Sequence, residues 1–404
     1  MQVLAPIESL TVTLWIVTAI AFGLAIWFAG AWYLRGADLR VFDKATDHNV
    51  QAWRQRFSSS PSLNDEHRTV IASLGGITAT VRNTPRRQHL GLLRKYMDSF
   101  NADRKFDVQF TPVDAGGVPA EWVLAPGANG ARRTLYIHGG AWIMGSPLSH
   151  RAITSKFSEI TGGAVLAIDY RLMPEHSRMA GIEDCRVAYR WMLEHGPTVV
   201  EPASAVFVAG DSAGGNLTLS LIAWVRDQSL RAPDAAVALS PATDGTLGSP
   251  SLRNNIATDA MLGPLFGPLA RVPRSALLWL VWMRHRIRPN HPLVSPVFGD
   301  LSDLPPLLIH ASEAEMLLDD TLRYANKASA AGSPVTVQTW AHMVHVWHIF
   351  DPDLTEARQA FAEIGHFLAR TTPAGFTQTE NARSLQKPNE LAPGSKDACR
   401  SEQT

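Results

Sequence analysis

Residues Gly210–Gly214 form the pattern Gly-x-Ser-x-Gly, with the serine at position 212. An apolar run, Ala205–Ala209, precedes the pattern, and a stretch with helical character, Asn216–Arg226, follows it. A strand that turns this sharply into a helix needs small residues two positions before and after the serine, and the turn exposes the hydroxyl above the sheet. The pattern and its flanks therefore predict an α/β fold in which Ser212 is a nucleophile. The alternative is an ordinary glycine-rich connector between a strand and a helix.

Backbone donors for an oxyanion are predicted upstream of this serine. The run Thr134–Ile137 has the composition of a buried strand, and His138, Gly139 and Gly140 follow it. Glycine leaves its backbone N–H uncovered, so these two glycine N–H groups and that of Ala213 can stabilise the negative charge that forms when a serine attacks a carbonyl. The alternative is a simple turn. His138 is expected to brace the loop and not to act as the base, because it precedes the serine in the chain and the histidine of such a site is expected after it.

A serine nucleophile also needs a histidine base and an acid that orients it. Two further strands are predicted at Pro306–His310 and Val335–Trp340. Carboxylates occur in the segment after the first strand, 311–320, and three histidines occur in the segment after the second, 341–348. The order serine, acid, histidine is the one expected on this kind of fold. All three groups would then lie on neighbouring loops at the carboxyl ends of parallel strands, where open α/β sheets place their sites.

At this point the chain resembles a known family, the bacterial hormone-sensitive-lipase-like esterases, also called the α/β-hydrolase fold-3 group. The resemblance extends from about Phe106 to Arg370, and several unrelated motifs occur in the order typical of the family. The matching segments are His138–Trp142, Asp169–Leu172, Pro174–His176, Gly210–Gly215, Pro292–Pro296 and Leu304–Leu307. The resemblance implies an α/β-hydrolase fold, with a mostly parallel sheet flanked by helices and covered by a helical cap.

The resemblance also implies the roles of individual residues. Ser212 is expected to be the nucleophile, His345 the base and Glu315 the acid, and the three backbone amides named above are expected to form the oxyanion hole. The family usually has aspartate within an Asp-Pro-Leu-Arg-Asp-Glu motif, and this chain has Glu315–Asp320 there. Asp319 is therefore the second candidate for the acid, although it also suits the start of a helix.

Three further points qualify this assignment. The third glycine of the family's histidine-glycine motif is Ala141 here, which preserves the backbone donors. The segment Ser177–Ala180 replaces the family's Pro-Phe-Pro-Ala, so the packing of that loop is expected to differ. His342 and His348 are the alternatives to His345 if the alignment is displaced.

The expected activity is that of a serine carboxylesterase that hydrolyses small-molecule esters with short-to-medium acyl groups through an acyl-enzyme intermediate. No cofactor is expected, and no group of residues has the spacing of a metal site. The same triad would also suit a lactone or amide hydrolase. A different class is a non-catalytic receptor, because the gibberellin receptors resemble this fold but lack the catalytic histidine.

The amino-terminal segment carries the second strong signal. No charged residue occurs from Thr11 to Leu34. This length suffices to cross a hydrocarbon core of about 30 Å as a helix, so residues 1–36 are predicted to be a membrane anchor. The alternatives are a cleaved signal peptide, with small residues in Ala29–Ala31, and a soluble apolar helix. The positive-inside rule predicts a cytoplasmic catalytic domain, because the basic residues follow the span. These residues are Arg35, Arg40 and Lys44.

The rest of the chain is divided by composition. Residues 37–105 are predicted to form a helical linker and part of the cap, with helices from about Ala45 to Asn101. Residues 106–370 are predicted to form the hydrolase domain, with a cap insertion at about 245–291, and 371–404 a polar, disordered tail. The formal net charge is zero, so the sequence predicts no nucleic-acid partner, and it carries no signal for an oligomeric state.

Overall fold

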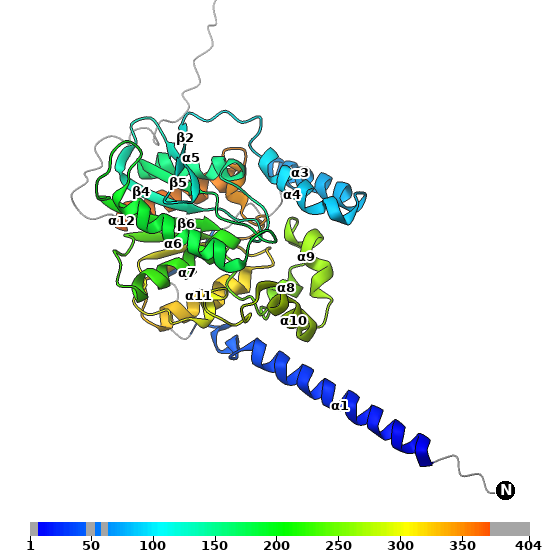
Figure 1. Ribbon diagram of the computed structural model, residues 1–404. Helices are drawn as coiled ribbons and strands as arrows, with labels where there is room; N and C mark the ends of the chain where they lie inside the picture. The colour runs from blue at the N-terminus through cyan, green and yellow to red at the C-terminus, as the bar shows by residue number, and fades with distance from the viewer. Residues whose placement is uncertain (1–6, 46–52, 58–63, 372–404) are drawn as a thin grey trace, which may run out of the picture.

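The computed structural model describes residues 7–45, 53–57 and 64–371. Nine strands form one sheet in the order β1-β9-β8-β7-β6-β4-β5-β3-β2. Among the described strands, the pairs β2–β3 and β3–β5 are antiparallel and the other neighbouring pairs are parallel. Figure 1 shows the sheet running through the middle of the molecule, with helices on both sides. The strands are β1 (Arg54–Phe57), β2 (Gln109–Asp114), β3 (Pro119–Leu124), β4 (Asn129–Ile137), β5 (Gly163–Ile168), β6 (Ala205–Asp211), β7 (Ala235–Leu239), β8 (Leu307–Ser312) and β9 (Val335–Trp340).

Two apolar cores cover the two faces of the sheet. Successive residues of a strand point to opposite faces, and in β6 Val208 belongs to one core while Phe207 and Ala209 belong to the other. Strands β5, β6 and β7 are buried at every residue, which explains their continuous apolar sequences. One face is covered by α6 (Arg178–Glu194), α7 (Ala213–Asp227) and α11 (Leu318–Ala330), and the other by α5 (Arg151–Thr161) and α12 (Thr355–Thr371).

This architecture confirms the predicted fold class, and one element was not predicted. The segment expected to contain only helices, Ala45–Asn101, also contains β1, which pairs in parallel with β9 at the edge of the sheet. Strand β1 is held there by the stacking of Phe57 on Trp340, with ring centroids 4.5 Å apart. The helices of this segment are α3 (Asp65–Arg82) and α4 (His89–Ser99).

The segment that follows β7 leaves the sheet and forms three helices, α8 (Ser251–Asn254), α9 (Leu262–Ala270) and α10 (Arg274–His285). These helices lie within the range expected for the cap insertion, about 245–291, and the chain breaks between α9 and α10. Pro273 lies at this break, directly before α10. Proline has no backbone N–H to donate to the preceding turn, so it favours the end of one helix and the start of another. Figure 1 shows that α3 and α4 lie on the same side of the molecule as α8, α9 and α10.

The first helix, α1 (Ile7–Arg35), projects from the globular part, and its carboxyl-terminal end contacts α10 (Figure 1). From Thr11 onward it belongs to a segment, Thr11–Phe42, that is long and apolar enough to cross a membrane, a property that signal sequences share. A short 3₁₀ helix, Leu39–Phe42, follows it. At the other end of the chain, α12 includes Thr371, the first residue of the predicted disordered tail, and the rest of that prediction, 372–404, lies outside the described residues.

Candidate active site

The serine of the Gly-x-Ser-x-Gly pattern lies in the sharp turn between β6 and α7. Ser212 has a backbone φ of 51° and ψ of −113°, a conformation that side chains larger than glycine rarely adopt. The turn leaves no room for a side chain on either flanking glycine. A Cβ atom at Gly210 would lie 2.6 Å from the Ile137 carbonyl oxygen, and one at Gly214 would collide with the same oxygen. The two glycines therefore let β6 and α7 pack against β4, and this packing holds the serine in its strained conformation.

Three side chains that are far apart in the sequence meet at this turn. His345 Nε2 lies 2.9 Å from Ser212 Oγ, and His345 Nδ1 lies 2.6 Å from Glu315 Oε2. Glu315 follows β8 and His345 follows β9, so both come from loops at the carboxyl ends of neighbouring strands. The second oxygen of Glu315 accepts a 2.8 Å hydrogen bond from the backbone N–H of Ser312, which fixes the carboxylate. Both His345 and Glu315 are buried.

The surroundings of His345 favour its protonated form. Burial by itself opposes the positive charge, but the hydrogen bond and the charge of Glu315 outweigh it and raise the pKa of His345 above its usual value. The charge of Asp259, from the segment between α8 and α9, acts in the same direction. Asp259 also accepts a 2.8 Å hydrogen bond from the backbone N–H of Met316, next to Glu315. An imidazole in this environment can accept a proton from Ser212 and hold it.

The alternative acid and base candidates lie elsewhere. Asp319 lies in the first turn of α11, and its carboxylate accepts a 2.7 Å hydrogen bond from the backbone N–H of Ser251. His342 is exposed, and His348 is buried with its Nε2 atom 3.0 Å from Nδ1 of His310. Of the three neighbouring histidines, it is therefore His345 that the structure brings to Ser212.

The predicted oxyanion donors fall into two groups. Gly140 has a φ of 109°, which a glycine adopts without strain, and Ala213 is the first residue of α7. The first N–H groups of a helix have no carbonyl partner within it, so the Ala213 N–H is available to an anion. Gly139 differs from the expectation, because its N–H donates a 3.0 Å hydrogen bond to Oδ1 of Asp211. The N–H of Gly139 therefore helps to hold the loop in place through Asp211.

This support is a buried polar network around Asp211, which the sequence interpretation did not assign. Oδ1 of Asp211 also accepts a 2.7 Å hydrogen bond from the Tyr136 hydroxyl, and Oδ2 lies 3.3 Å from Nε2 of His150. Burial alone would raise the pKa of Asp211, but the positive charge and hydrogen bond of His150, with that of Tyr136, lower it. The only sequence signal for this role was the position of Asp211 directly before the nucleophile.

His138 braces the same loop, as expected. Its ring stacks on Tyr170 with centroids 4.3 Å apart, and the Tyr170 hydroxyl donates a 3.0 Å hydrogen bond to the His138 carbonyl oxygen. Burial, followed by the charge of His150, lowers the pKa of His138 to about 3. His138 is therefore a neutral side chain at neutral pH, and its contacts support the loop.

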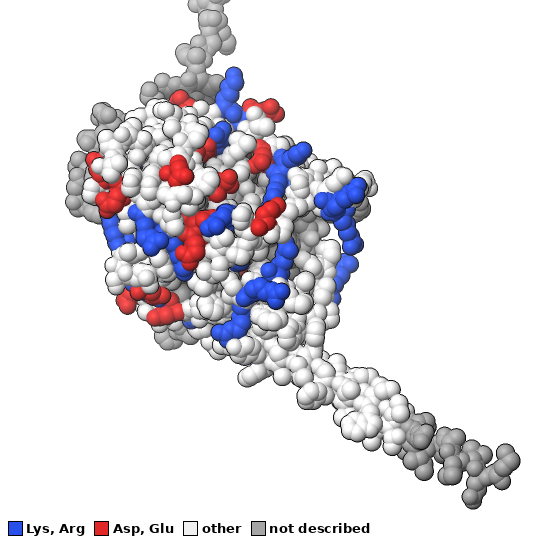
Figure 2. Space-filling view, in the orientation of Figure 1, with Lys and Arg blue, Asp and Glu red and all other residues white. Residues whose placement is uncertain are grey.

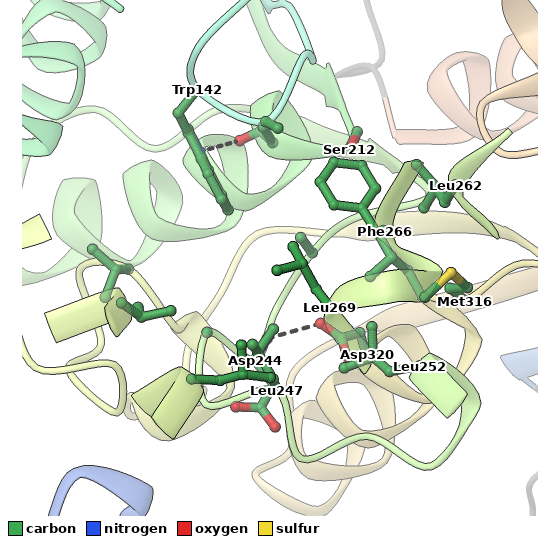
Figure 3. A pocket seen from close by; sticks show the side chains of 18 of the residues that line it. Trp142, Ser212, Asp244, Leu247, Leu252, Leu262, Phe266, Leu269, Met316 and Asp320 are labelled. Atoms are coloured by element: carbon green, nitrogen blue, oxygen red, sulfur yellow. Dashed lines mark hydrogen bonds between the residues drawn. The ribbon is translucent and has the colours of Figure 1, made fainter. Parts of the chain in front are cut away.

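Two apolar cavities meet at Ser212. The larger, of about 220 Å³, lies under α9 and α10, and the smaller, of about 130 Å³, lies between α4 and α9. Figure 3 shows that Trp142, Phe266 and Leu269 border the larger cavity and that Asp244 and Asp320 lie at its end away from Ser212. The smaller cavity is lined by side chains of α4, of the residue that directly follows it and of α9, which are Leu93, Tyr96, Met97, Phe100, Leu262 and Leu265.

Comparisons with known proteins agree with this geometry. A family model described as an α/β hydrolase fold matches residues 134–349. An acetyl-hydrolase of Streptomyces hygroscopicus is 40% identical over 264 residues, which cover 65% of this chain and 84% of that protein. The carboxylesterase/phospholipase LipF of Mycobacterium tuberculosis (strain ATCC 25618 / H37Rv) is 36% identical over 269 residues, which cover 65% of this chain and 69% of that protein.

A solved structure gives the same result at the level of the fold. The crystal structure of an esterase from the bacterial hormone-sensitive lipase family is 34% identical, with a TM-score of 0.67. The match covers 77% of this chain and 100% of that chain. The resemblance found in the sequence motifs is thereby confirmed, and the chain belongs to the α/β-hydrolase fold family, within the group of bacterial hormone-sensitive-lipase-like esterases.

Proposed function

We propose that this protein is a serine carboxylesterase whose triad is Ser212, His345 and Glu315. The observation that carries the proposal is the position of His345, whose two ring nitrogens lie within hydrogen-bond distance of the Ser212 hydroxyl and the Glu315 carboxylate. This arrangement is the one in which a histidine activates a serine and an acid orients the histidine. The named relatives are esterases and an acetyl-hydrolase, which supports esters over lactones or amides as the substrate class.

The reaction follows from the positions of these groups. Ser212 Oγ attacks the ester carbonyl carbon while its proton passes to His345 Nε2, and Glu315 stabilises the resulting imidazolium. The N–H groups of Gly140 and Ala213 stabilise the oxyanion. His345 then returns the proton to the alkoxide that leaves, which forms an alcohol and an acyl-enzyme. A water molecule attacks the acyl-enzyme with His345 again as the base, and this step releases the acid and the free serine.

The cavities define the kind of ester. Apolar side chains make up most of the lining of both cavities, so both the acyl and the alcohol groups of the substrate are expected to be apolar. The volume of the larger cavity, about 220 Å³, supports an acyl group of short-to-medium length. Lining residues come from the amino-terminal segment 37–105, such as Leu93 and Met97, and from the insertion 245–291, such as Phe266 and Leu277. We propose on this basis that these two segments together form the cap of a hydrolase domain at 106–370.

The test is hydrolysis of a short-chain aryl ester by the wild-type chain and by Ser212→Ala. We expect the variant to lose hydrolysis and to lose covalent labelling by a fluorophosphonate probe. Labelling and turnover that persist in Ser212→Ala would reject the triad. A wild-type chain that binds aryl esters without labelling or turnover would instead support the non-catalytic receptor class.

We further propose that α1 anchors the enzyme in a membrane, with the catalytic domain on the cytoplasmic side. The charge-free run Thr11–Leu34 supports the span, and the basic residues after it support the orientation. Extraction of the membrane fraction with alkaline carbonate tests the anchor, because an integral protein stays in the pellet. A mature chain that begins after Ala31 would identify a signal peptide. Digestion of the catalytic domain by protease added outside sealed cells would reverse the orientation, because a cytoplasmic domain is protected there.

A further inference from the structure

The cap helix α10 lies between the active-site cavity and the amino-terminal helix. Its side chains divide into three faces, because residues three or four positions apart share one face of a helix. The first face lines the larger cavity, the second packs against α1, and the third is exposed. These faces comprise Leu277, Val281 and His285 for the cavity, Leu278, Trp279 and Trp282 for the contact with α1, and Leu280, Met283 and Arg284 for the exposed surface.

The contact between α1 and α10 is close and specific. The Trp27 and Trp279 rings lie with centroids 5.6 Å apart, and Trp279 Nε1 donates a 3.2 Å hydrogen bond to the Trp27 carbonyl oxygen. A Cβ atom at Gly30 would collide with the Trp279 indole, so the glycine permits this approach. Beyond α10, the guanidinium of Arg288 donates a 2.6 Å hydrogen bond to the Tyr33 hydroxyl. The contact therefore occupies the last two turns of the charge-free run.

The length of the charge-free run places α10 at the depth of the membrane interface. The run Thr11–Leu34 is about 36 Å long at the helical rise, but the part before the contact, Thr11–Ile26, is only about 24 Å long. A hydrocarbon core of about 30 Å is longer than this part by about one helical turn. Extending the span toward the amino terminus would draw Glu8 into hydrocarbon, which is costly. If α1 spans a bilayer, as proposed above, the Trp279 side of α10 therefore lies at the boundary between acyl chains and headgroups.

The surface of this part of the cap suits that boundary. The segment Ala260–Gly299 contains five arginines and no acidic residue. Leu269, Leu280 and Met283 are among the large apolar side chains that are exposed, the last two at 52% each. In the view of Figure 2, acidic side chains lie over the sheet domain, whereas no acidic surface covers α8–α10. Exposed apolar groups beside arginines are typical of helices that lie in an anionic lipid interface. The exposed arginines are Arg271, Arg284, Arg286 and Arg288.

We propose that α10 and the end of α9 form a lipid-binding surface of the cap, and that the active site takes its ester from the bilayer. The partner is the headgroup region of an anionic phospholipid membrane. Only the thickness of α10 separates this surface from the cavity, since Leu277 and Met283 lie on different faces of the same helix. The substrate class is then an ester that partitions into the bilayer. This inference rests on the proposed esterase activity and on the proposed anchor.

A fluorescent probe at position 283 tests the surface directly. In a Cys399→Ser background the remaining native cysteine, Cys185, is buried, so Met283→Cys can be labelled with an environment-sensitive dye. We expect a blue shift when the full chain is reconstituted into vesicles that contain anionic phospholipid, relative to the chain in detergent. The control is Val200→Cys, which is 76% exposed in the loop before β6, at the opposite end of the strands from Ser212. Equal emission at position 283 in vesicles and detergent would overturn the proposal.

A kinetic comparison tests the route of the substrate. The double variant Leu280→Glu/Met283→Glu places charges on the exposed face without changing a residue that lines the cavity. We expect it to hydrolyse a vesicle-dissolved aryl octanoate about tenfold more slowly than the wild type, and a water-soluble aryl acetate at the same rate. Val199→Glu/Val200→Glu should change neither rate. Equal losses on both esters, or no loss on either, would contradict the proposal.

The two underlying assumptions have separate readouts. A wild-type chain that fails to cleave aryl acetate indicates that the proposed esterase activity is wrong. A wild-type chain that cleaves aryl acetate but is extracted by alkaline carbonate indicates that the anchor is wrong. Either of these results would also overturn the proposal that the active site takes its ester from the bilayer, because that proposal rests on both assumptions.

Discussion

The carboxylate of Asp211 and the backbone N–H of Gly139 are joined by a hydrogen bond of 3.0 Å, although 72 positions separate them in the chain. The bond links the nucleophile turn to the loop that carries Gly140. Because Asp211 directly precedes Ser212, a movement of the oxyanion loop relative to the serine requires this bond to break. Asp211 therefore acts as a positioning residue for the proposed oxyanion hole.

We predict that Asp211→Ala lowers kcat about 10- to 100-fold with a smaller change in KM, because displaced oxyanion donors stabilise the transition state less. Asp211→Asn should lose less activity, since its amide oxygen can still accept from the N–H of Gly139. The measurement is steady-state hydrolysis of an aryl ester. A purely structural role would instead lower the amount of folded protein and leave kcat per labelled active site unchanged, which fluorophosphonate titration detects.

The acid of the triad can be distinguished from its neighbour by a matched pair of variants. Glu315→Gln keeps the size of the side chain but removes the charge that stabilises the imidazolium of His345, so we expect kcat to fall about 10³- to 10⁴-fold. Asp319→Asn is the control, because Asp319 bonds the backbone of Ser251 and does not contact His345. A large loss in Asp319→Asn with little loss in Glu315→Gln would reassign the acid.

The contact between Glu315 and His345 also predicts a shift in the pH profile of Glu315→Gln. The imidazole must be neutral to accept the serine proton, so kcat/KM falls as the pH drops through the pKa of His345. Burial opposes the charge, but Glu315 raises this pKa above its usual value, so the acid limb of the wild type lies at higher pH than that of an ordinary imidazole. In Glu315→Gln burial acts without this compensation, and the limb moves to lower pH. A pH series on the residual activity measures the shift, and a limb that stays in place would contradict the assignment.

Much of the site could be predicted because short sequence patterns determine the turn at Ser212 and the order of the site residues. The turn at Ser212 follows from glycines at two fixed offsets between an apolar strand and a helix, and the order of the acid and the histidine follows from the order of the strands. Strand β1 shows the limit of such reasoning. Its sequence, Arg54–Phe57, has one apolar residue in four, and it becomes a strand through contacts with β9 that are remote in sequence, including the stacking of Phe57 on Trp340.

The partner of the Gly139 N–H and the docking of α1 were unpredictable for a related reason. A glycine pair indicates uncovered amides, but which amide points to the serine depends on the fold of the whole loop and on Asp211, which reaches it from another strand. Likewise the apolar composition of Thr11–Leu34 indicates a span but not a contact. The contact depends on the shape of Trp279 beside Gly30, and these positions are brought together only when the cap has folded.

The cap also yields a prediction about acyl length. Leu277 is buried at the wall of the larger cavity, and Leu280 lies on the exposed face of the same helix. Leu277→Ala enlarges the cavity, so we expect the preferred acyl chain to become longer, with a loss of about 2–3 kcal/mol in the free energy of unfolding. Leu280→Ala should keep the wild-type preference in soluble assays and change stability by less than about 0.5 kcal/mol. A chain-length series of aryl esters, with denaturant unfolding, measures both; an unchanged preference in Leu277→Ala would exclude this cavity as the acyl site.

The far end of that cavity gives a pH-dependent contribution to stability. Burial, together with the charge of Asp244, raises the pKa of Asp320 to about 7. Unfolding exposes the carboxyl and returns its pKa to its ordinary value of 3.8. Between about pH 4 and pH 7 the folded state therefore holds a proton that the unfolded state has released, and the free energy of unfolding falls as the pH rises, by at most about 1.4 kcal/mol per pH unit.

Asp320→Asn imitates the protonated carboxyl, because its amide oxygen can accept from the backbone N–H groups of Thr243 and Asp244 as Asp320 does. We expect this variant to match the wild type near pH 4 and to exceed its stability at pH 8, where the wild type buries a charge. Asp319→Asn, the adjacent substitution, should retain the wild-type slope. Urea unfolding at several pH values gives the comparison, and parallel curves for Asp320→Asn and the wild type would show that Asp320 is ionised in the folded protein throughout this range.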